Sequence, residues 1–166
     1  MVNATPATLR KASVDDAAAI ADLAVQLGYP VTVSDIVERL SKLPEDTEAV
    51  VVATIAGVVR AWMQVGVALS IESAPFAEIR GLVVDANLRS SGVGSQLVAF
   101  AQEWALTKHV ASLRVRSNTV RTATHAFYQK RGFSVGKEQK VFVLALPQTD
   151  KSRVVDAAAH ATNSAN

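Results

Sequence analysis

The chain has 166 residues, 49% of them hydrophobic, which suits one globular domain with a sizeable core and excludes a disordered protein. The formal net charge is only +2, and no dense stripe of Lys and Arg indicates a nucleic-acid-binding protein. There is no cysteine for disulfides or thiolate metal sites, no apolar run of membrane-spanning length and no signal peptide in residues 1–9, so we expect a cytoplasmic protein that binds no membrane.

The first half of the chain predicts two helices between β-strands. The helices show apolar residues at helical spacing, with Ser13 as an N-cap, Gly28 as a stop and a second stop before Pro44. Two β-branched runs around the turn Ala56–Gly57 predict an antiparallel hairpin. The expected elements are a strand at 8–13, helices at 13–28 and 34–43, and strands at 48–55 and 58–69.

The second half predicts helices that connect further strands. The expected elements are a strand at 77–84, a helix at 93–108, a strand at 112–117, a helix at 121–131 and a final strand pair at 133–146. Hairpins combined with helical crossovers indicate an α/β (α+β) fold with a mixed, largely antiparallel central sheet and helices on both faces. We expect a single domain over residues 1–147. Residues 148–166 are small, polar and Ala-rich, which is typical of a disordered or weakly helical tail.

A glycine-rich turn, Arg89 to Ser95, joins the strand at 77–84 to the following helix. Glycines at a helix N-terminus let backbone N–H groups approach phosphate oxygens, although such turns also occur without a ligand. The turn is no P-loop, because Ser95-Gln96 follows the last glycine instead of Lys-Ser/Thr. It is no dinucleotide fingerprint either, because only Gly92 and Gly94 of the three required glycines are present.

Two segments in this order resemble the GNAT family of N-acetyltransferases. The segment VVDANLRSSGVGSQLV at 83–98 is similar to the family's acetyl-CoA loop, Arg/Gln-x-x-Gly-x-Gly/Ala. The segment SNTVRTATHAFYQKRGF at 117–133 is similar to its strand-to-helix segment that ends in Phe-Tyr and Gly-Phe. The resemblance covers residues 8–146 and implies a GNAT-like acyl-CoA N-acyltransferase fold with acetyl-CoA as co-substrate.

The resemblance also implies where acetyl-CoA binds. The strands on either side of the 93–108 helix would splay apart, and the pantetheine arm would lie in that gap, near Asn118. Tyr128 would lie close to the thioester sulfur. Backbone groups of Val83, Val84 and Asp85 would contact pantetheine. The pyrophosphate would bind the backbone amides of Arg89, Ser90, Ser91, Gly92, Val93, Gly94 and Ser95.

The chemistry of acetyl transfer then indicates two catalytic candidates. Most alkyl amines are protonated at pH 7, so a group must take a proton before the amine attacks. Glu78, a lone acid in the central strand, is the candidate base, unless it forms a solvated ion pair with Arg80. Tyr128 is the candidate acid for the departing thiolate, although it could instead pack on the sheet. No covalent enzyme intermediate is needed.

The remaining candidate side chains are less informative about function. Tyr29 and Trp62 are candidates for lining the acceptor pocket, and Trp62 could equally belong to the core. Arg114 and Arg116 alternate on one strand face, which either solvent exposure or contact with the adenosine phosphate explains. The histidines offer no metal constellation, so we expect no metal. His125 fits local packing better than catalysis.

The sequence therefore predicts an acetyl-CoA-dependent N-acetyltransferase that acts on a primary amine of a small molecule or on an exposed peptide amine. Two alternatives remain open: an enzyme that uses another acyl-CoA, and a CoA-binding sensor without turnover. A homodimer could form if a C-terminal strand pairs with a second copy through an exposed sheet edge.

Overall fold

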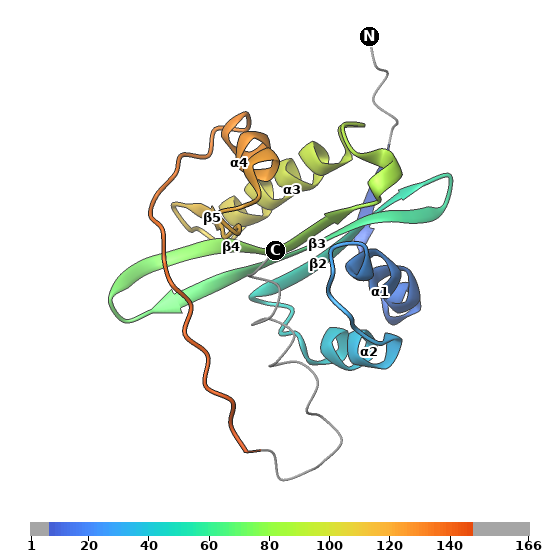
Figure 1. Ribbon diagram of the computed structural model, residues 1–166, viewed down its shortest axis with the longest axis horizontal. Helices are drawn as coiled ribbons and strands as arrows, with labels where there is room; N and C mark the ends of the chain where they lie inside the picture. The colour runs from blue at the N-terminus through green and yellow to red at the C-terminus, as the bar shows by residue number, and fades with distance from the viewer. Residues whose placement is uncertain (1–6, 148–166) are drawn as a thin grey trace. The chain divides into compact units, whose positions relative to one another are not determined.

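The computed structural model describes residues 7–147, in two compact units divided between Arg121 and Thr122. The first unit contains five strands and three α-helices (Figure 1). Their bounds are β1 Thr8–Lys11, α1 Ala17–Val25, α2 Val33–Lys42, β2 Glu48–Ile55, β3 Val58–Ser70, β4 Ser73–Val84, α3 Val93–Thr107 and β5 Leu113–Val115. Short 3₁₀ turns, η1 Val14–Asp16 and η2 Ala86–Leu88, precede α1 and α3.

The five strands form one mixed sheet in the order β1-β2-β3-β4-β5. Neighbouring strands are antiparallel except β4 and β5, which are parallel. This arrangement confirms the predicted fold class, because α3 is the crossover that a parallel pair requires. The β4–β5 pairing runs only from Ala77–Leu113 to Ile79–Val115, although β4 continues to Val84.

Helices cover both faces of the sheet, with α3 on one side and α1 and α2 on the other (Figure 1). Successive residues along each strand point alternately toward the two faces of the sheet, and thus toward the helices on either side. A hollow near α3 is lined by Val50 and Val51 of β2 with Phe100 and Trp104, whereas a hollow near α2 is lined by Val50 with Leu40 and Leu43. The central strand residues Val51, Met63 and Val65 are fully buried, so the core lies where β2 and β3 pass under the helices.

The second unit contains α4, Thr122–Gln129, and an extended segment. Gly132 ends the helical region with φ of +85°, and the Phe133 N–H donates to the Tyr128 carbonyl at 3.2 Å. The Tyr128 ring packs edge-on against Phe127 and Phe133, with centroids 5.0 and 5.3 Å apart. The predicted tail, 148–166, lies outside the described residues.

The predicted strand pair at 133–146 is wrong, because residues 133–147 form no strand. The composition favours β-structure, and Val141, Phe142, Val143 and Leu144 are 69–89% exposed. Strand propensity is realised only where a neighbouring strand supplies hydrogen bonds and packing. Within the described residues this segment has no ladder partner, so the predicted route to a homodimer through a C-terminal strand loses its basis.

An ion pair between the exposed Arg10 and the buried Asp16 joins β1 to the start of α1. The two Nη atoms of Arg10 each donate to the Asp16 carboxylate at 2.7 Å, and the Ser13 N–H donates to it at 2.8 Å. The Arg10 hydrogen bond holds the pKa of Asp16 below its ordinary value, and the Ser13 bond adds to this. Asp16 therefore stabilises the fold above the unfolded-state pKa of about 4, and this stabilisation is lost as the pH falls through the lower folded-state value.

We predict that Asp16→Asn lowers the Tm by about 2–6 °C at pH 7, and that the difference shrinks below about pH 4. The matched control is Glu45→Gln, because Glu45 is also an acid paired to β1, through Lys11 at 2.6 Å, but its side chain is 80% exposed. We expect the control to shift the Tm by less than about 1 °C. Calorimetry across pH 3–7 checks both. Equal shifts for the two variants at pH 7 would contradict the prediction.

Candidate functional site

The loop that leads into α3 is anchored by Asp85. Its carboxylate accepts the Asn87 N–H at 3.0 Å and the Arg60 Nη1 at 3.1 Å. The Asn87 bond holds the pKa of Asp85 below its ordinary value, and Arg60 adds to this. The Leu88 N–H donates to the Asp85 carbonyl, and the Ser91 N–H to the Leu88 carbonyl, so η2 closes as a compact turn. Asp85, predicted as a backbone contact for pantetheine, thus also fixes the loop by its side chain.

The same loop presents a helix N-terminus with an orphaned hydroxyl. Gly92 caps α3 with φ of +93°, and Ser90 has φ of +69°. The Gln96 N–H makes an early helical bond, to the Gly92 carbonyl, so the amides of Val93 and Gly94 point out of the helix end. The Ser91 Oγ is buried and has no hydrogen-bond partner among the described residues. Amides, helix dipole and an unsatisfied hydroxyl together fit a phosphate group.

A gap opens beside the end of β4. Val83 and Val84 pair with Trp62 and Ala61 of β3 on one side, but β5 has already ended on the other. After β5 the chain turns at Asn118, whose Oδ1 accepts the Val120 N–H at 3.1 Å. In the first unit the β4–β5 pairing therefore ends before β4 does, and the glycine-rich loop follows β4.

Glu78 lies on β4 just before this gap. In the sheet register it stands opposite Gly66, which stands opposite Glu48, so all three lie on one face. Glu48 borders both the hollow near α2 and the hollow near α3. Glu78 is buried, and both of its oxygens accept hydrogen bonds from Arg116, at 2.7 and 3.0 Å.

The alternative considered for Glu78, an ion pair with Arg80, is wrong. Arg80 instead binds Glu48 at 2.6 Å, and Gln64 donates to the same carboxylate at 2.9 Å. Glu78 is free to bind Arg116 because a bulge in β4 redirects Arg80 toward β2. Sequence reasoning missed Glu48 as a neighbour of this face. The alternation along 48–55 places it on the same face as Val50, but its partners depend on the register.

The two residues predicted to line the pocket for the acceptor amine, Trp62 and Tyr29, differ in their surroundings. Trp62 is half-buried, and a Cβ on Gly81 would lie 2.9 Å from its Cη2, so the indole lies over β4. Its Nε1 is buried without a hydrogen-bond partner in the part of the chain that the structure describes, which makes it an available donor. Tyr29 is 42% exposed in the connection between α1 and α2. The structure brings Trp62 to Gly81 on β4.

Tyr128, in the second unit, is buried, with an exposed fraction of 8%. Burial raises the pKa of Tyr128 to about 12, although the nearby Arg131 charge opposes the shift. The phenol is therefore protonated at physiological pH, the form that a proton donor requires.

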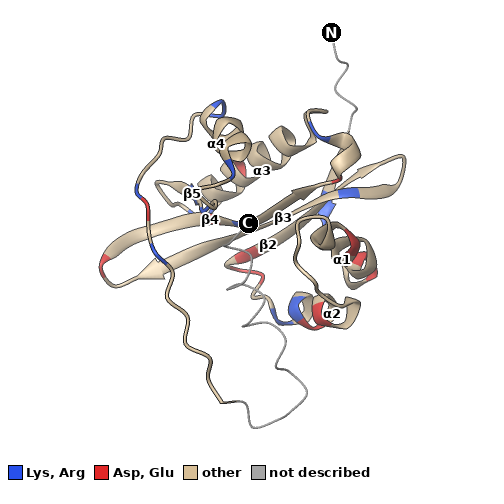
Figure 2. Ribbon diagram, in the orientation of Figure 1, with Lys and Arg blue, Asp and Glu red and all other residues tan. Residues whose placement is uncertain are grey.

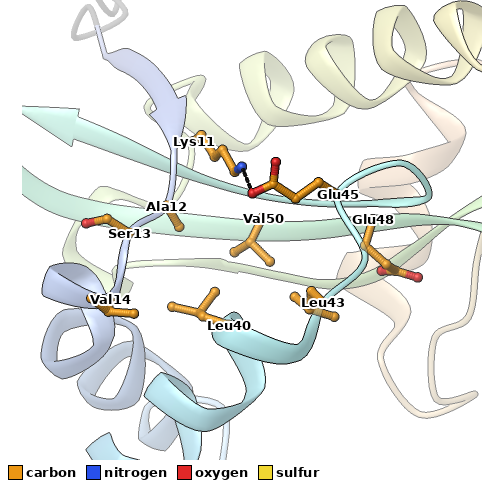
Figure 3. A pocket seen from close by; sticks show the side chains of 9 residues that line it. All are labelled: Lys11, Ala12, Ser13, Val14, Leu40, Leu43, Glu45, Glu48 and Val50. Atoms are coloured by element: carbon orange, nitrogen blue, oxygen red, sulfur yellow. Dashed lines mark hydrogen bonds and ion pairs between the residues drawn. The ribbon is translucent and has the colours of Figure 1, made fainter.

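The hollow near α2, which Leu40 and Leu43 line (Figure 3), has a volume of about 210 Å³. Its walls combine apolar side chains with the Lys11–Glu45 ion pair and the Glu48 carboxylate. Basic residues of the first unit are spread over β1, α2, β3 and the loop before α3 instead of forming one stripe (Figure 2). Within residues 7–147 no three His, Asp or Glu side chains gather as metal ligands, and no helix is long and apolar enough to cross a membrane.

Residues 18–133, more than half of the chain, match the acetyltransferase (GNAT) family. The chain belongs to this family, which confirms the resemblance and, at the level of the family, the predicted class of N-acetyltransferase. Members of the family use acetyl-CoA as co-substrate and act on an acceptor.

Individual proteins are similar to this chain in sequence or in fold. A streptothricin acetyltransferase from Escherichia coli is 33% identical over 60 residues, which are 36% of this chain and 34% of that protein. The chain thus matches about a third of that relative's length. An aminoglycoside 6′-N-acetyltransferase from Acinetobacter baumannii has a TM-score of 0.74 at 17% identity, over 86% of this chain and all of that one. Glucosamine-6-phosphate N-acetyltransferase from Arabidopsis thaliana has a TM-score of 0.72 at 19% identity, over 84% and 99%.

We predict that Gly92→Val weakens acetyl-CoA binding by at least about tenfold, because a β-branched residue cannot adopt φ of +93° and its side chain blocks the approach to the loop amides. Isothermal titration calorimetry measures the Kd. The control is Gly57→Val in the β2–β3 turn, where φ is +79° and a Cβ would meet open space. The control carries similar backbone strain, so it should lose stability but keep its Kd. Unchanged affinity in Gly92→Val, or equal weakening in both, would contradict the prediction.

Proposed function

We propose that the protein transfers an acetyl group directly from acetyl-CoA to a primary amine of a small molecule or to an exposed peptide amine. One observation carries this proposal. A helix N-terminus whose first amides have no partner within the helix, together with the orphaned Ser91 hydroxyl, follows a strand, β4, whose pairing with its parallel neighbour β5 has already ended. Such a site can hold a phosphate-bearing co-substrate with an extended arm beside a strand.

The cofactor-binding residues follow from this arrangement. The amides of Gly92, Val93 and Gly94 bind the pyrophosphate, and the exposed Arg89 adds a positive charge. The backbone of Val83 and Val84 and the region of Asn118 border the pantetheine arm. The remaining members of the proposed site on this loop are Asp85, Ser90, Ser91 and Ser95. Acetyl-CoA supplies the electrophile, a thioester carbonyl, and the chain supplies orientation and proton transfer.

Glu78 is proposed as the general base. It is buried on β4 near the point where β4 and β5 separate, on the face that also carries Trp62. The attacking amine must lose a proton, and a carboxylate on this strand can take it directly or through a water molecule. A β4 backbone N–H near Val84 is suited to stabilise the tetrahedral oxyanion. No side chain forms a covalent bond to the acetyl group.

The acceptor is proposed to be a small hydrophilic amine. The names of the relatives support this, because streptothricin, aminoglycosides and glucosamine-6-phosphate all bear amino groups. Trp62 would contribute an apolar ring and one free N–H donor to the acceptor pocket. Tyr29, in the α1–α2 connection, would lie at its entrance.

The test is mass detection of acetylated product from a panel of amines, with acetyl-CoA and, in parallel, propionyl-CoA. The panel contains streptothricin, aminoglycosides, amino sugars and short peptides. A product of 42 mass units above the amine supports the proposal, since an acetyl group replaces one hydrogen. Faster reaction with propionyl-CoA would favour the alternative acyl group. Binding of acetyl-CoA without any product would favour a CoA-binding sensor and contradict the proposal.

Tyr128 is proposed as the acid that protonates the departing CoA thiolate. We predict that Tyr128→Phe lowers kcat by about 10²-fold while acetyl-CoA affinity is unchanged, because the ring and its packing remain and only the phenol is lost. Steady-state kinetics with the amine from the panel and calorimetry with acetyl-CoA measure the two effects. Phe127→Leu is the control, because Phe127 contacts the Tyr128 ring but carries no proton to donate. Full kcat in Tyr128→Phe would remove Tyr128 from the mechanism.

A further inference from the structure

The proposed base, Glu78, already forms an ion pair with a cationic side chain of the same protein, Arg116. Arg116 Nε donates to Glu78 Oε1 at 2.7 Å and Nη2 to Oε2 at 3.0 Å, so a single guanidinium engages both oxygens. The two side chains differ sharply in exposure, at 77% for Arg116 and 9% for Glu78. Pairing of Ile79 with Val115 places Arg116 one residue beyond the last β4–β5 pair, where the strands separate.

These two hydrogen bonds, called the clamp below, compete with proton transfer to Glu78. A guanidinium bound to both oxygens takes two of the about four lone-pair sites of a carboxylate, on the edge where both oxygens are approached together. Arg116 cannot take that proton, because Glu78 raises the pKa of its guanidinium further above an already high value. An ammonium group can engage this edge of the carboxylate only when the guanidinium has left at least one oxygen.

The difference in exposure determines how the clamp opens. Arg116 can turn into solvent at little cost, since water already surrounds most of its side chain. Glu78 cannot be left alone, because a buried carboxylate without a partner is strongly destabilising. Release of Arg116 is therefore favourable only when another cation replaces it.

The other cations on this face are already engaged. Arg80 binds Glu48, and Arg60 binds Asp85. The Arg114 guanidinium stacks on the Phe76 ring, 3.7 Å from its centroid. No cation of the described chain other than Arg116 forms an ion pair with Glu78.

We propose that Arg116 is a positioning residue that holds the place of the acceptor's ammonium group, so that the site selects amines that arrive protonated. This inference rests on the proposed role of Glu78. The incoming R–NH₃⁺ displaces the guanidinium and transfers one proton to the Glu78 carboxylate. The nitrogen of the resulting R–NH₂ attacks the thioester carbon, so the C–N bond forms and the C–S bond breaks. The nitrogen gives up its second proton and the CoA thiolate takes one, so CoA leaves as the neutral thiol. The proton on Glu78 then passes to solvent, and Arg116 returns.

The experiment compares Arg116→Gln with the wild-type enzyme, using the amine identified in the panel. If the clamp is closed about 90% of the time, its removal should lower KM for the amine by about tenfold. We expect kcat to stay within about threefold and KM for acetyl-CoA to stay unchanged. Arg116→Lys, which keeps a cation but not the two-point geometry, should give an intermediate KM for the amine.

Arg114→Gln is the matched control. Arg114 lies two residues earlier on the same chain segment and carries the same charge, but it forms no ion pair with Glu78. Its loss should leave KM for the amine unchanged. An unchanged or raised KM in Arg116→Gln, or an equal fall in both variants, would overturn the proposal and leave Arg116 as a structural link between β4 and β5.

A second measurement needs neither turnover nor a stable Gln variant. The Nε–H resonance of Arg116 in the ¹⁵N NMR spectrum is assigned by its absence in Arg116→Lys. Addition of ethylenediamine, a small diammonium probe, to the wild-type protein with bound CoA should weaken and shift this resonance, and ethylene glycol should not. An unchanged resonance at a saturating probe concentration would overturn the clamp. Absence of product from the whole panel, in contrast, would count against the proposed function alone.

Discussion

The structure depends on one feature of the sheet, the early end of pairing between β4 and β5. These strands are joined for three residue pairs, up to Ile79–Val115, and β4 then continues to Val84 paired with β3 alone. A free strand edge inside a domain is normally covered or filled, because its backbone groups otherwise lack partners. Here the unpaired edge leads directly into the Gly92 loop, and Glu78 and Arg116 meet at the point of separation. The candidate cofactor site and the candidate base thus arise from one interruption of the ladder.

Local features of the site were predictable from the sequence, because short-range chemistry determines them. Gly92 was expected at a position that needs unusual backbone freedom, and it caps α3 with a left-handed φ. The hairpin strands around Ala56–Gly57 also follow the prediction, since β-branched runs and a tight turn specify each other. These features involve residues that are close in the chain.

The partners of the charged residues could not be predicted in the same way. Glu78 and Arg80 share one strand, which suggested that they pair, but the β4 bulge and the register assign them to Arg116 and Glu48. Such contacts depend on how strands distant in sequence align. The segment at 133–146 shows the opposite failure, because its strand-like composition finds no ladder partner among the described residues. Composition indicates a strand, but a neighbouring strand is needed to form one.

The central claim is that the loop before α3 and the free end of β4 together hold acetyl-CoA. An amide ¹H–¹⁵N NMR titration of the wild-type protein with CoA tests it most directly, since it reports every backbone N–H and needs no acceptor. We expect the largest shifts at Gly92, Val93 and Gly94, and a second group at residues 82–85. Shifts confined to the hollow lined by Leu40, Leu43 and Glu45, with the loop amides unchanged, would contradict the account.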